Sequence, residues 1–204
     1  DKRGTAELLE QYKALAAKPG LSVRKDGDAE KAIAGAKTVI DAEFVFPFLA
    51  HAPMEPLNAI LAFKDNKATI WSGSQLQTID QSVAAAILGI KPEDVAINTQ
   101  WAGGSFDRRA VYNSDYVAEV AHIVKALATD KPIKVVWTRE DDIKGGYYRP
   151  MYVHKVKVGL TESGDIAGWH HRIVGQSIME GTAFAASSVK NGVDATSVEG
   201  VSDT

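Results

Sequence analysis

Strand-type and helix-type segments alternate along the middle of this chain, and that alternation constrains the fold more than any other feature. Residues 57–63 and 68–71 predict a hairpin around Asp65-Asn66-Lys67, and strand-type residues return at 95–101 and 133–138. Two apolar stripes at helical spacing separate these strands: Ile79, Val83, Ala86, Ile87 and Ile90, then Val117, Val120, Ala121, Val124 and Leu127. The pattern predicts an α/β (α+β) domain with a mixed β-sheet and flanking helices.

Residues outside this region predict further elements. The segment 47–56 contains three prolines, which exclude a helix interior or a central strand there. The remaining expected elements are a helix capped by Thr5 and ended by Pro19-Gly20, a short helix over 29–34, a strand over 39–46, and a hairpin of 152–160 with 166–178. A boundary is predicted after residue 35, between an N-terminal helical segment (1–35) and one main domain (36–204).

Composition excludes several classes of function. Lys and Arg total 23 against 26 Asp and Glu, so the net charge of −3 gives no electrostatic footprint for nucleic acid. The chain has no cysteine, which excludes disulfides, thiol catalysis and ligation of an iron–sulfur cluster by this chain. No apolar run approaches the roughly 20 residues of a membrane-spanning helix, so a soluble chain is expected.

A glycine-bearing loop, Gly103 to Arg109, lies between a predicted strand and a predicted helix. Glycines let a backbone approach a ligand closely, and successive amides can form an anion-binding concavity. Arg108 and Arg109 add donors suited to a phosphate. The alternative is a tight strand-to-helix turn with solvated arginines, and spacing alone leaves both open.

Other candidate residues carry weaker signals. Ser105 lacks the flanking pattern of a nucleophile elbow, so an acyl-transfer site is disfavoured. His170 and His171 are adjacent and point to opposite faces of a strand, which disfavours a shared metal. Gln75 follows a predicted strand, where it either caps the next helix or faces a crevice at the strand end.

Five segments together resemble one family in order and spacing. They are His51 to Ala59 (HAPMEPLNA), Trp71 to Gln75 (WSGSQ), Gly103 to Arg109 (GGSFDRR), Val135 to Asp142 (VVWTREDD) and Tyr148-Arg149-Pro150. The chain is similar, from about Val23 to Ser177, to the molybdopterin-binding large subunit of molybdenum hydroxylases, the xanthine dehydrogenase/aldehyde oxidoreductase family. Within it, the isoquinoline 1-oxidoreductase beta-subunit branch is the most similar.

The resemblance implies an oxidoreductase that hydroxylates N-heterocycles or oxidises aldehydes with oxygen derived from water. It implies molybdopterin cytosine dinucleotide with molybdenum as cofactor, and two [2Fe–2S] clusters on a separate small subunit as the electron acceptor. A cysteine-free chain agrees with that division. Members of this branch are often exported folded, so a periplasmic location is expected, with the cytoplasm as the alternative.

The resemblance also implies roles at matching positions. Gln75 resembles the glutamine that hydrogen-bonds a molybdenum oxygen ligand. Phe106 and Asp107 resemble the loop pair whose amides face the apical oxygen, and Gly103 and Gly104 allow that approach. No residue here is predicted to ligate the metal, and the catalytic residue is unknown because the family's base glutamate lies outside this chain.

Two positions depart from the family pattern. Asp107 stands where glycine is usual, and a carboxylate there would repel an electron-rich oxygen ligand. The sequence leaves two alternatives: either its side chain turns outward, toward Arg108 or Arg109, or the site of this protein is altered. Ala110 stands where xanthine dehydrogenases carry a substrate-orienting glutamate, which disfavours a purine substrate.

The chain is expected to be a fragment of the large subunit, inactive and free of cofactor when isolated. Three functions compete. The first is an oxidoreductase fragment, the second is a cofactor-free binding or assembly module that retains the fold, and the third is a serine hydrolase that rests on Ser105 alone. Asp107 motivates the second.

Overall fold

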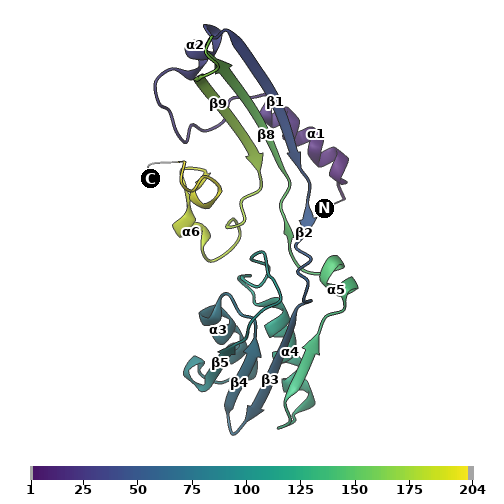
Figure 1. Cartoon of the computed structure of the whole chain (residues 1–204). Helices are drawn as coiled ribbons and strands as arrows, with labels where there is room; N and C mark the ends of the chain where they lie inside the picture. The colour runs from purple at the N-terminus through teal and green to yellow at the C-terminus, as the bar shows by residue number, and fades with distance from the viewer. Residues whose placement is uncertain (1, 202–204) are drawn as a thin grey trace. The chain divides into compact units, whose positions relative to one another are not determined.

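The computed structural model describes residues 2–201, and the chain forms two compact units (Figure 1). The unit Ala50–Arg149 contains the glycine loop and is called the loop unit below; Asp1–Leu49 with Pro150–Thr204 is called the terminal unit. The chain thus divides after residues 49 and 149, whereas the sequence predicted a boundary after residue 35. Two short strands, β2 (Leu49–Ala50) and β7 (Tyr148–Arg149), pair beside these division points.

The loop unit contains a four-stranded mixed sheet with strand order β5-β4-β3-β6, as predicted from the alternating pattern. Strand β3 pairs antiparallel with β4 and β6, and β4 pairs parallel with β5 through the crossover helix α3. Its elements are β3 (Asn58–Lys64), β4 (Lys67–Ser72), α3 (Gln77–Leu88), η1 (Pro92–Asp94), β5 (Val95–Thr99), α4 (Asp115–Leu127), β6 (Ile133–Val136) and α5 (Arg139–Lys144).

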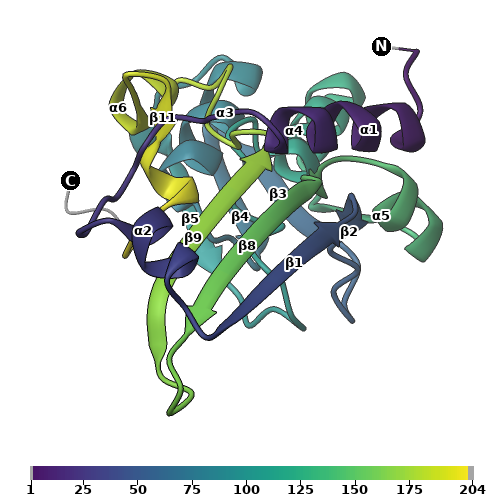
Figure 2. The same cartoon turned by 90° about the horizontal axis from the view of Figure 1, so that it is seen from above.

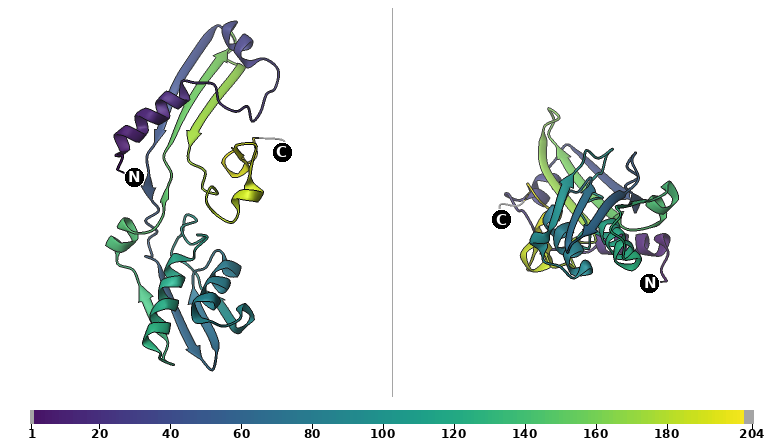
Figure 3. Two further views of the ribbon diagram at one scale, coloured as in Figure 1. Left: turned by 180° about the vertical axis from the view of Figure 1, so that it is seen from behind. Right: turned by 90° about the horizontal axis from the view of Figure 1, so that it is seen from below.

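Helices α3 and α4 cover one face of this sheet and form the core with it (Figure 3). Strand side chains alternate between faces, so Ala59 and Leu61 of β3 point toward the helices and are fully buried. The predicted α4 stripe is buried except for Leu127, which is exposed at the last turn. Residues of the core are Leu57, Ala59, Leu61, Ala68, Ile70, Ala84, Ala85, Leu88, Val95, Tyr116, Val117, Val120, Ala121 and Val124.

Local signals account for the turns and helix ends of the loop unit. Asp65 and Asn66 have φ of 51° and 58°, the left-handed pair of a two-residue hairpin turn. Gly89 ends α3 with φ 78°, a conformation that favours glycine. Helix α5 is not predicted by periodicity, but Thr138 and Asp141 form a capping box at its start.

The terminal unit contains a three-stranded antiparallel sheet with strand order β1-β8-β9, against which α1 and α2 pack (Figures 1 and 2). Its elements are α1 (Thr5–Ala16), α2 (Ala29–Ala34), β1 (Thr38–Phe46), β8 (Tyr152–Leu160), β9 (Ile166–Gly175), α6 (Ala185–Ser188), β10 (Val189–Lys190), β11 (Val193–Asp194) and η2 (Ala195–Ser197). The hairpin of β8 and β9 and the short helix over 29–34 are as predicted.

Both helices lie on the same face of this sheet. A Cβ on Gly159 would lie 2.9 Å from the Ile33 Cα, so α2 packs directly on strand backbone. Arg172 of β9 donates to the Ala16 carbonyl at the end of α1 (2.9 Å). The start of α1 differs from the prediction: Gly4, not Thr5, is the N-cap, and its N–H donates to Glu7 Oε2 (2.9 Å).

The opposite face carries exposed apolar side chains and a histidine pair. Phe44, Phe46 and Trp169 are each about half exposed on this face. His154 of β8 and His171 of β9 lie among them, with His154 Nδ1 2.9 Å from His171 Nε2. No helix within residues 2–201 is long and apolar enough to cross a membrane.

Candidate functional site

The loop after β5 holds its backbone in left-handed conformations at three positions. Gly104, Phe106 and Asp107 have φ of 93°, 53° and 65°. A left-handed residue with a side chain costs about 1–2 kcal/mol, so the surrounding contacts must fix this shape. Within the described chain, the amides of Phe106 and Asp107 donate no hydrogen bond, and both residues are exposed. The loop therefore holds, at two consecutive exposed residues, amides that have no hydrogen-bond partner in the described chain.

Gln75, just after β4, holds this loop through its side chain. Its Oε1 accepts from the Ser105 hydroxyl and from the Arg109 amide (3.2 Å), and its Nε2 donates to Asp107 Oδ1 (3.2 Å). The structure thus brings Gln75 together with the glycine loop, and the role of Gln75 toward an oxygen ligand stays a prediction. The helix-capping alternative for Gln75 is wrong, because its carboxamide binds the loop and not the amides of α3.

The carboxylate of Asp107 does not turn toward Arg108 or Arg109, so the first of the two alternatives is wrong. It accepts from Gln75 Nε2, because the left-handed backbone at Phe106 and Asp107 directs the side chain toward the end of β4. The negative charge therefore lies on the same side as the glutamine that the resemblance assigned to an oxygen ligand.

Ser105 is held as a structural residue. Its hydroxyl donates to Gln75 Oε1 and accepts from the Arg109 amide (3.2 Å). A serine nucleophile needs an adjacent general base, and Ser105 has none among these partners. The serine hydrolase alternative loses its basis.

Arg108 and Arg109 are buried, so neither the phosphate-binding nor the solvated alternative is correct. Arg108 is 2 % exposed, pairs with Asp115 (2.6 Å), and lies over the rings of Trp137 and Tyr147 with its Cζ 5.6 and 5.9 Å from their centroids. Gly146 leaves space for it, since a Cβ there would lie 2.1 Å from an Arg108 guanidinium nitrogen. Ion pairing and aromatic packing together offset the cost of burying this charge.

Arg109 is 1 % exposed and binds Glu55 twice, at the carboxylate (3.3 Å) and at the main-chain carbonyl (3.4 Å). The same carboxylate accepts from the Gly103 amide (2.6 Å) and the Asn58 side chain (2.8 Å). The hydrogen bond from Gly103, with that from Asn58, lowers the pKa of Glu55. Glu55 stays ionised at neutral pH and joins the proline segment to both ends of the loop.

A buried polar layer lies beneath the loop. Asp80 is 1 % exposed and accepts from the Ser74 hydroxyl (2.5 Å). Burial raises the pKa of Asp80, and burial together with the Asp80 charge raises the pKa of Tyr116 to about 12. Unpaired buried atoms remain in the described chain at Ser72, Ser114, Tyr116 Oη and Arg109 Nε and Nη1. Such groups are commonly satisfied by internal water.

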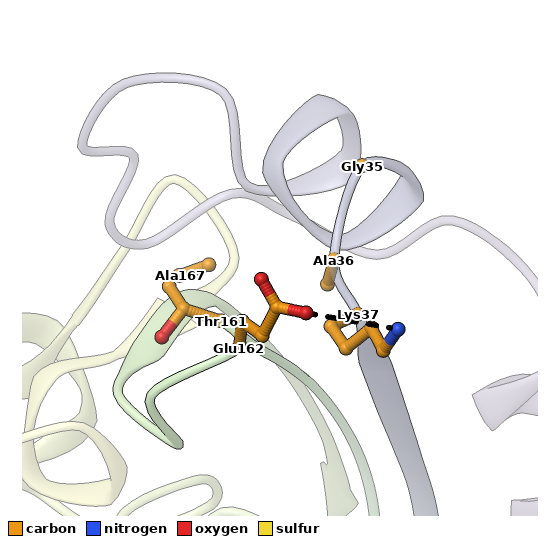
Figure 4. Close-up of a pocket in the computed structure, with 6 residues that line it drawn as sticks. All are labelled: Gly35, Ala36, Lys37, Thr161, Glu162 and Ala167. Atoms are coloured by element: carbon orange, nitrogen blue, oxygen red, sulfur yellow. Dashed lines mark ion pairs between the residues drawn. The ribbon is translucent and has the colours of Figure 1, made fainter.

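The described chain has two notable surface hollows, one in each unit, and Glu55 and Asn58 line the first. In the loop unit, a groove of about 460 Å³ is lined by Glu55, Asn58, Ile60, Trp71, Ser72, Gly73, Gln100, Trp101, Pro132 and Lys134. In the terminal unit, a hollow of about 540 Å³ is lined by Gly35, Ala36, Lys37, Thr161, Glu162 and Ala167, where Lys37 and Glu162 form an exposed ion pair of 3.9 Å (Figure 4). None of the predicted site residues lines either one. Across residues 2–201, no cluster of three or more histidine or acidic side chains could hold a metal ion.

An exposed loop with two unpartnered amides, adjoining buried charges in an α/β domain, is typical of backbone sites for anionic ligands. The chain matches the molybdopterin cofactor-binding domain family over residues 13–192, and it belongs to that family. The predicted resemblance, the fold class and the molybdenum cofactor as the class of ligand are thereby confirmed.

Two relatives indicate the range of the family. The chain is 38 % identical over 112 residues to isoquinoline 1-oxidoreductase subunit beta of Brevundimonas diminuta, covering 54 % of this chain and 14 % of that protein. It is 26 % identical over 185 residues to the aldehyde oxidoreductase molybdenum-binding subunit PaoC of Escherichia coli K12, covering 90 % of this chain and 25 % of that protein. The chain thus spans a quarter or less of these relatives.

Solved oxidoreductase structures share this fold. Quinoline 2-oxidoreductase from Pseudomonas putida 86 superposes with a TM-score of 0.59 over 72 % of this chain and 18 % of that chain, at 14 % identity. The aldehyde oxidoreductase from Desulfovibrio gigas superposes with a TM-score of 0.53 over 70 % of this chain and 15 % of that chain, at 21 % identity.

The structure gives three residues a supporting role that the sequence did not assign to them. Glu55, Arg109 and Arg139 hold the loop and the proline segment in place, and each lies in a motif that carried the resemblance. Glu55 occurs in the Met-Glu-Pro motif, between two prolines, and can be picked out from the sequence. Its partner Gly103 cannot, because it lies 48 residues further along the chain.

Proposed function

We propose that this chain is part of the molybdenum-cofactor-binding subunit of an oxidoreductase that hydroxylates N-heterocycles or oxidises aldehydes, using oxygen derived from water. The observation that supports this most is the pair of free amides at Phe106 and Asp107 beside the Gln75 carboxamide. The names of the relatives support the same reaction class.

The residues of this loop fit an anionic group rich in oxygen. Backbone amides are fixed donors, so they stabilise negative charge without reorganising. A Cβ on Gly103 would lie 2.6 Å from Glu55 Cβ and one on Gly104 3.7 Å from Pro53 Cβ, so these glycines let the loop adopt this shape against the segment 47–56. Gln75 Nε2 adds a third donor once it leaves Asp107. When bound, the cofactor supplies two-electron redox chemistry. Phe106, Asp107 and Gln75 would bind and orient it.

Finer parts of this proposal rest on the resemblance. They are the cytosine dinucleotide form of the cofactor, a [2Fe–2S] small subunit as partner and a periplasmic location. The roles of Gln75, Gly103, Gly104, Phe106 and Asp107 in binding the cofactor belong to the same proposal.

A second function has one observation in its favour. The Asp107 carboxylate engages Gln75 Nε2, the donor that a cofactor oxygen would need. A module that has lost the cofactor and serves in assembly would tolerate such a contact. Both functions share the fold, so the metal content decides between them.

The test uses the full-length polypeptide that carries this segment, purified with its iron–sulfur partner. Molybdenum is measured by mass spectrometry, the nucleotide released by acid is identified, and oxidation of isoquinoline and benzaldehyde is assayed. Stoichiometric molybdenum with turnover supports the oxidoreductase. Absence of molybdenum from the folded complex supports the assembly module.

Gln75→Ala sharpens this test. Loss of one oriented donor at such a centre costs about 3 kcal/mol of barrier, so turnover should fall about a hundredfold. Molybdenum content should change less, because retention is spread over many contacts. Gln77→Ala is the matched control, since Gln77 binds the Ser74 carbonyl and Thr99 instead of the loop. Unchanged turnover in Gln75→Ala at full molybdenum occupancy would remove Gln75 from the site.

A further inference from the structure

We propose that Glu55 is a positioning residue that fixes the backbone of the glycine loop by joining its two ends. The inference rests on the proposed function, because that function gives the loop its purpose. Glu55 does not face the exposed amides itself. It acts on them through Gly103 and Arg109.

The first contact is a reciprocal pair of hydrogen bonds. The Glu55 amide donates to the Gly103 carbonyl (3.1 Å), and the Gly103 amide donates to Glu55 Oε2 (2.6 Å). A Cβ at Gly103 would lie 2.6 Å from the Glu55 Cβ, so no other residue fits here without movement. The start of the loop is therefore fixed in both position and orientation.

The second contact closes the loop at its other end. Arg109, six residues after Gly103, reaches the same Oε2 (3.3 Å) and the Glu55 carbonyl (3.4 Å). One carboxylate oxygen thus accepts from both ends of the segment that carries Phe106 and Asp107. Left-handed conformations at those two residues need such fixed ends to persist.

Glu55 is itself held from behind. Arg139 of α5 donates to the carbonyls of Pro53 (2.6 Å) and Met54 (2.9 Å), and it pairs with Asp142 (2.7 Å). Pro53 and Pro56 further restrict the backbone on both sides of Glu55. The backbone of the proline segment (residues 47–56) is therefore restricted, so a change at the Glu55 side chain should displace the loop and not this segment.

The charge and both oxygens of Glu55 are needed for this arrangement. Oε1 accepts from Asn58 Nδ2 (2.8 Å), while Oε2 accepts from Gly103 and Arg109. In Glu55→Gln, at least one of these donors would face the new amide group and lose its acceptor. The double variant Glu55→Gln with Asn58→Asp reverses the first pair, because the new amide group can then donate to the new carboxylate, and it gives up only the bond from Asn58 Nδ2 to the Pro56 carbonyl (3.0 Å). The carbonyl oxygen of the substituted side chain remains free to accept from the Gly103 amide.

The test follows backbone amides by NMR in this chain, which needs no cofactor. Glu55→Gln should shift the resonances of Gly103, Phe106 and Asp107, and it should speed exchange of the Gly103 amide about tenfold, as expected for one lost bond to a charged acceptor. The double variant should return the Gly103 resonance toward its original position. Glu93→Gln, an exposed carboxylate of η1, is the control and should leave all three unchanged.

A pH titration of the unmodified chain separates positioning from simple stabilisation. The low pKa of Glu55 predicts that the three amides share one midpoint below 4.5, the ordinary value. The other charged groups that face this carboxyl are the side chains of Arg109 and Lys134. Glu55→Gln should abolish the shared transition, and Glu55→Asp should keep a transition with displaced loop resonances.

Two results would overturn the proposal. One is a shift at Gly103 alone, with Phe106 and Asp107 unmoved by Glu55→Gln. The other, decisive even if that variant does not fold, is the absence of a shared titration in the unmodified chain. In the full-length protein, Glu55→Gln should lower kcat more than it changes KM, at retained molybdenum. Loop shifts in a protein that binds no molybdenum would refute the proposed function and leave the positioning role intact.

Discussion

The two units of this chain bury apolar and charged groups in different ways. The loop unit encloses a core between sheet and helices, and it also buries Arg108, Arg109 and Asp80 next to the glycine loop. The terminal unit covers one face of its sheet with α1 and α2 and leaves aromatic side chains about half exposed on the other.

The difference shows where each unit obtains its stability. In the loop unit, tight packing extends from the apolar core to the buried charged groups that support the glycine loop. A substitution in either of these two layers should therefore also destabilise the other. In the terminal unit, the strand ladder and one helical layer carry the structure, and the open face contributes little. Equivalent substitutions should therefore have unequal effects in the two units.

The largest effect is expected for Arg108→Ala. Removal of the guanidinium leaves Asp115 without its partner and opens a cavity between Trp137 and Tyr147, which should cost about 3–5 kcal/mol of unfolding free energy. Arg172→Ala is the counterpart in the terminal unit, where one hydrogen bond to the Ala16 carbonyl is lost, at about 1 kcal/mol. The free energy of unfolding of each unit is measured in urea, with amide exchange in α4 reporting on the loop unit and exchange in β8 on the terminal unit. Equal losses of stability in the two variants would contradict the proposed difference between the units.

Apolar truncation should give the next largest contrast. Leu61 is fully buried, so Leu61→Ala should destabilise the loop unit by about 2–5 kcal/mol. Phe44 is 51 % exposed on the open face of the terminal unit, so Phe44→Ala should cost about 1 kcal/mol or less. The same unfolding experiment measures both. If Phe44→Ala costs as much as Leu61→Ala, the open face supports its unit more than its exposure indicates.

Local sequence signals predicted the framework and missed its long-range polar contacts. The Asp65-Asn66 turn and the end of α3 at Gly89 follow from backbone preferences encoded in a few neighbouring residues. The burial of Arg108 and Arg109 does not follow from local sequence, because arginine is usually exposed. Only the fold brings Asp115 and Glu55 to them as partners.

The candidate site shows the same limit. Its residues could be named from motifs, since Gln75 and the glycine loop occur at recognisable spacing. The direction of the Asp107 side chain could not be predicted, because it depends on two consecutive left-handed residues that the sequence pattern does not specify. Glu55 was visible within a motif, but its pairing with Gly103 is set by tertiary structure.

Protonation of histidines should change the stability of both units by less than these substitutions do. Burial and Arg108 lower the pKa of His51 in the loop unit, and burial and His171 lower that of His154 in the terminal unit. Below pH 6.5 these histidines bind more protons in the unfolded chain than in the folded chain. The stability that the neutral histidines contribute above pH 6.5 should therefore be lost as the pH falls from 6.5 through their pKa values in the folded chain.

Histidine ring resonances followed by NMR measure these midpoints directly. His51 and His154 should titrate below 6.5, and His171→Gln should raise the midpoint of His154 and leave that of His51 unchanged. A change at His51 in that variant would contradict the separate treatment of the two units. A midpoint at or above 6.5 for either residue would contradict the role of burial.

Asp107→Gly should change stability least and inform function most. Glycine adopts φ 65° without the penalty of about 1–2 kcal/mol, but the variant loses the Gln75 contact and gains freedom when unfolded, so the net change should stay within about 1 kcal/mol. The Gln75 side-chain amide resonance should move. Asp65→Gly, the control at φ 51° in the hairpin turn, should leave that resonance unchanged.

In the full-length protein, Asp107→Gly should raise turnover or leave it unchanged, because the backbone donor remains and a negative charge beside the ligand is removed. A cofactor-free assembly module predicts no turnover in either form. A clear loss of activity would contradict both functions as stated, since it would mean that the Asp107 carboxylate acts on the substrate or cofactor directly and that its contact with Gln75 keeps it in position for that role.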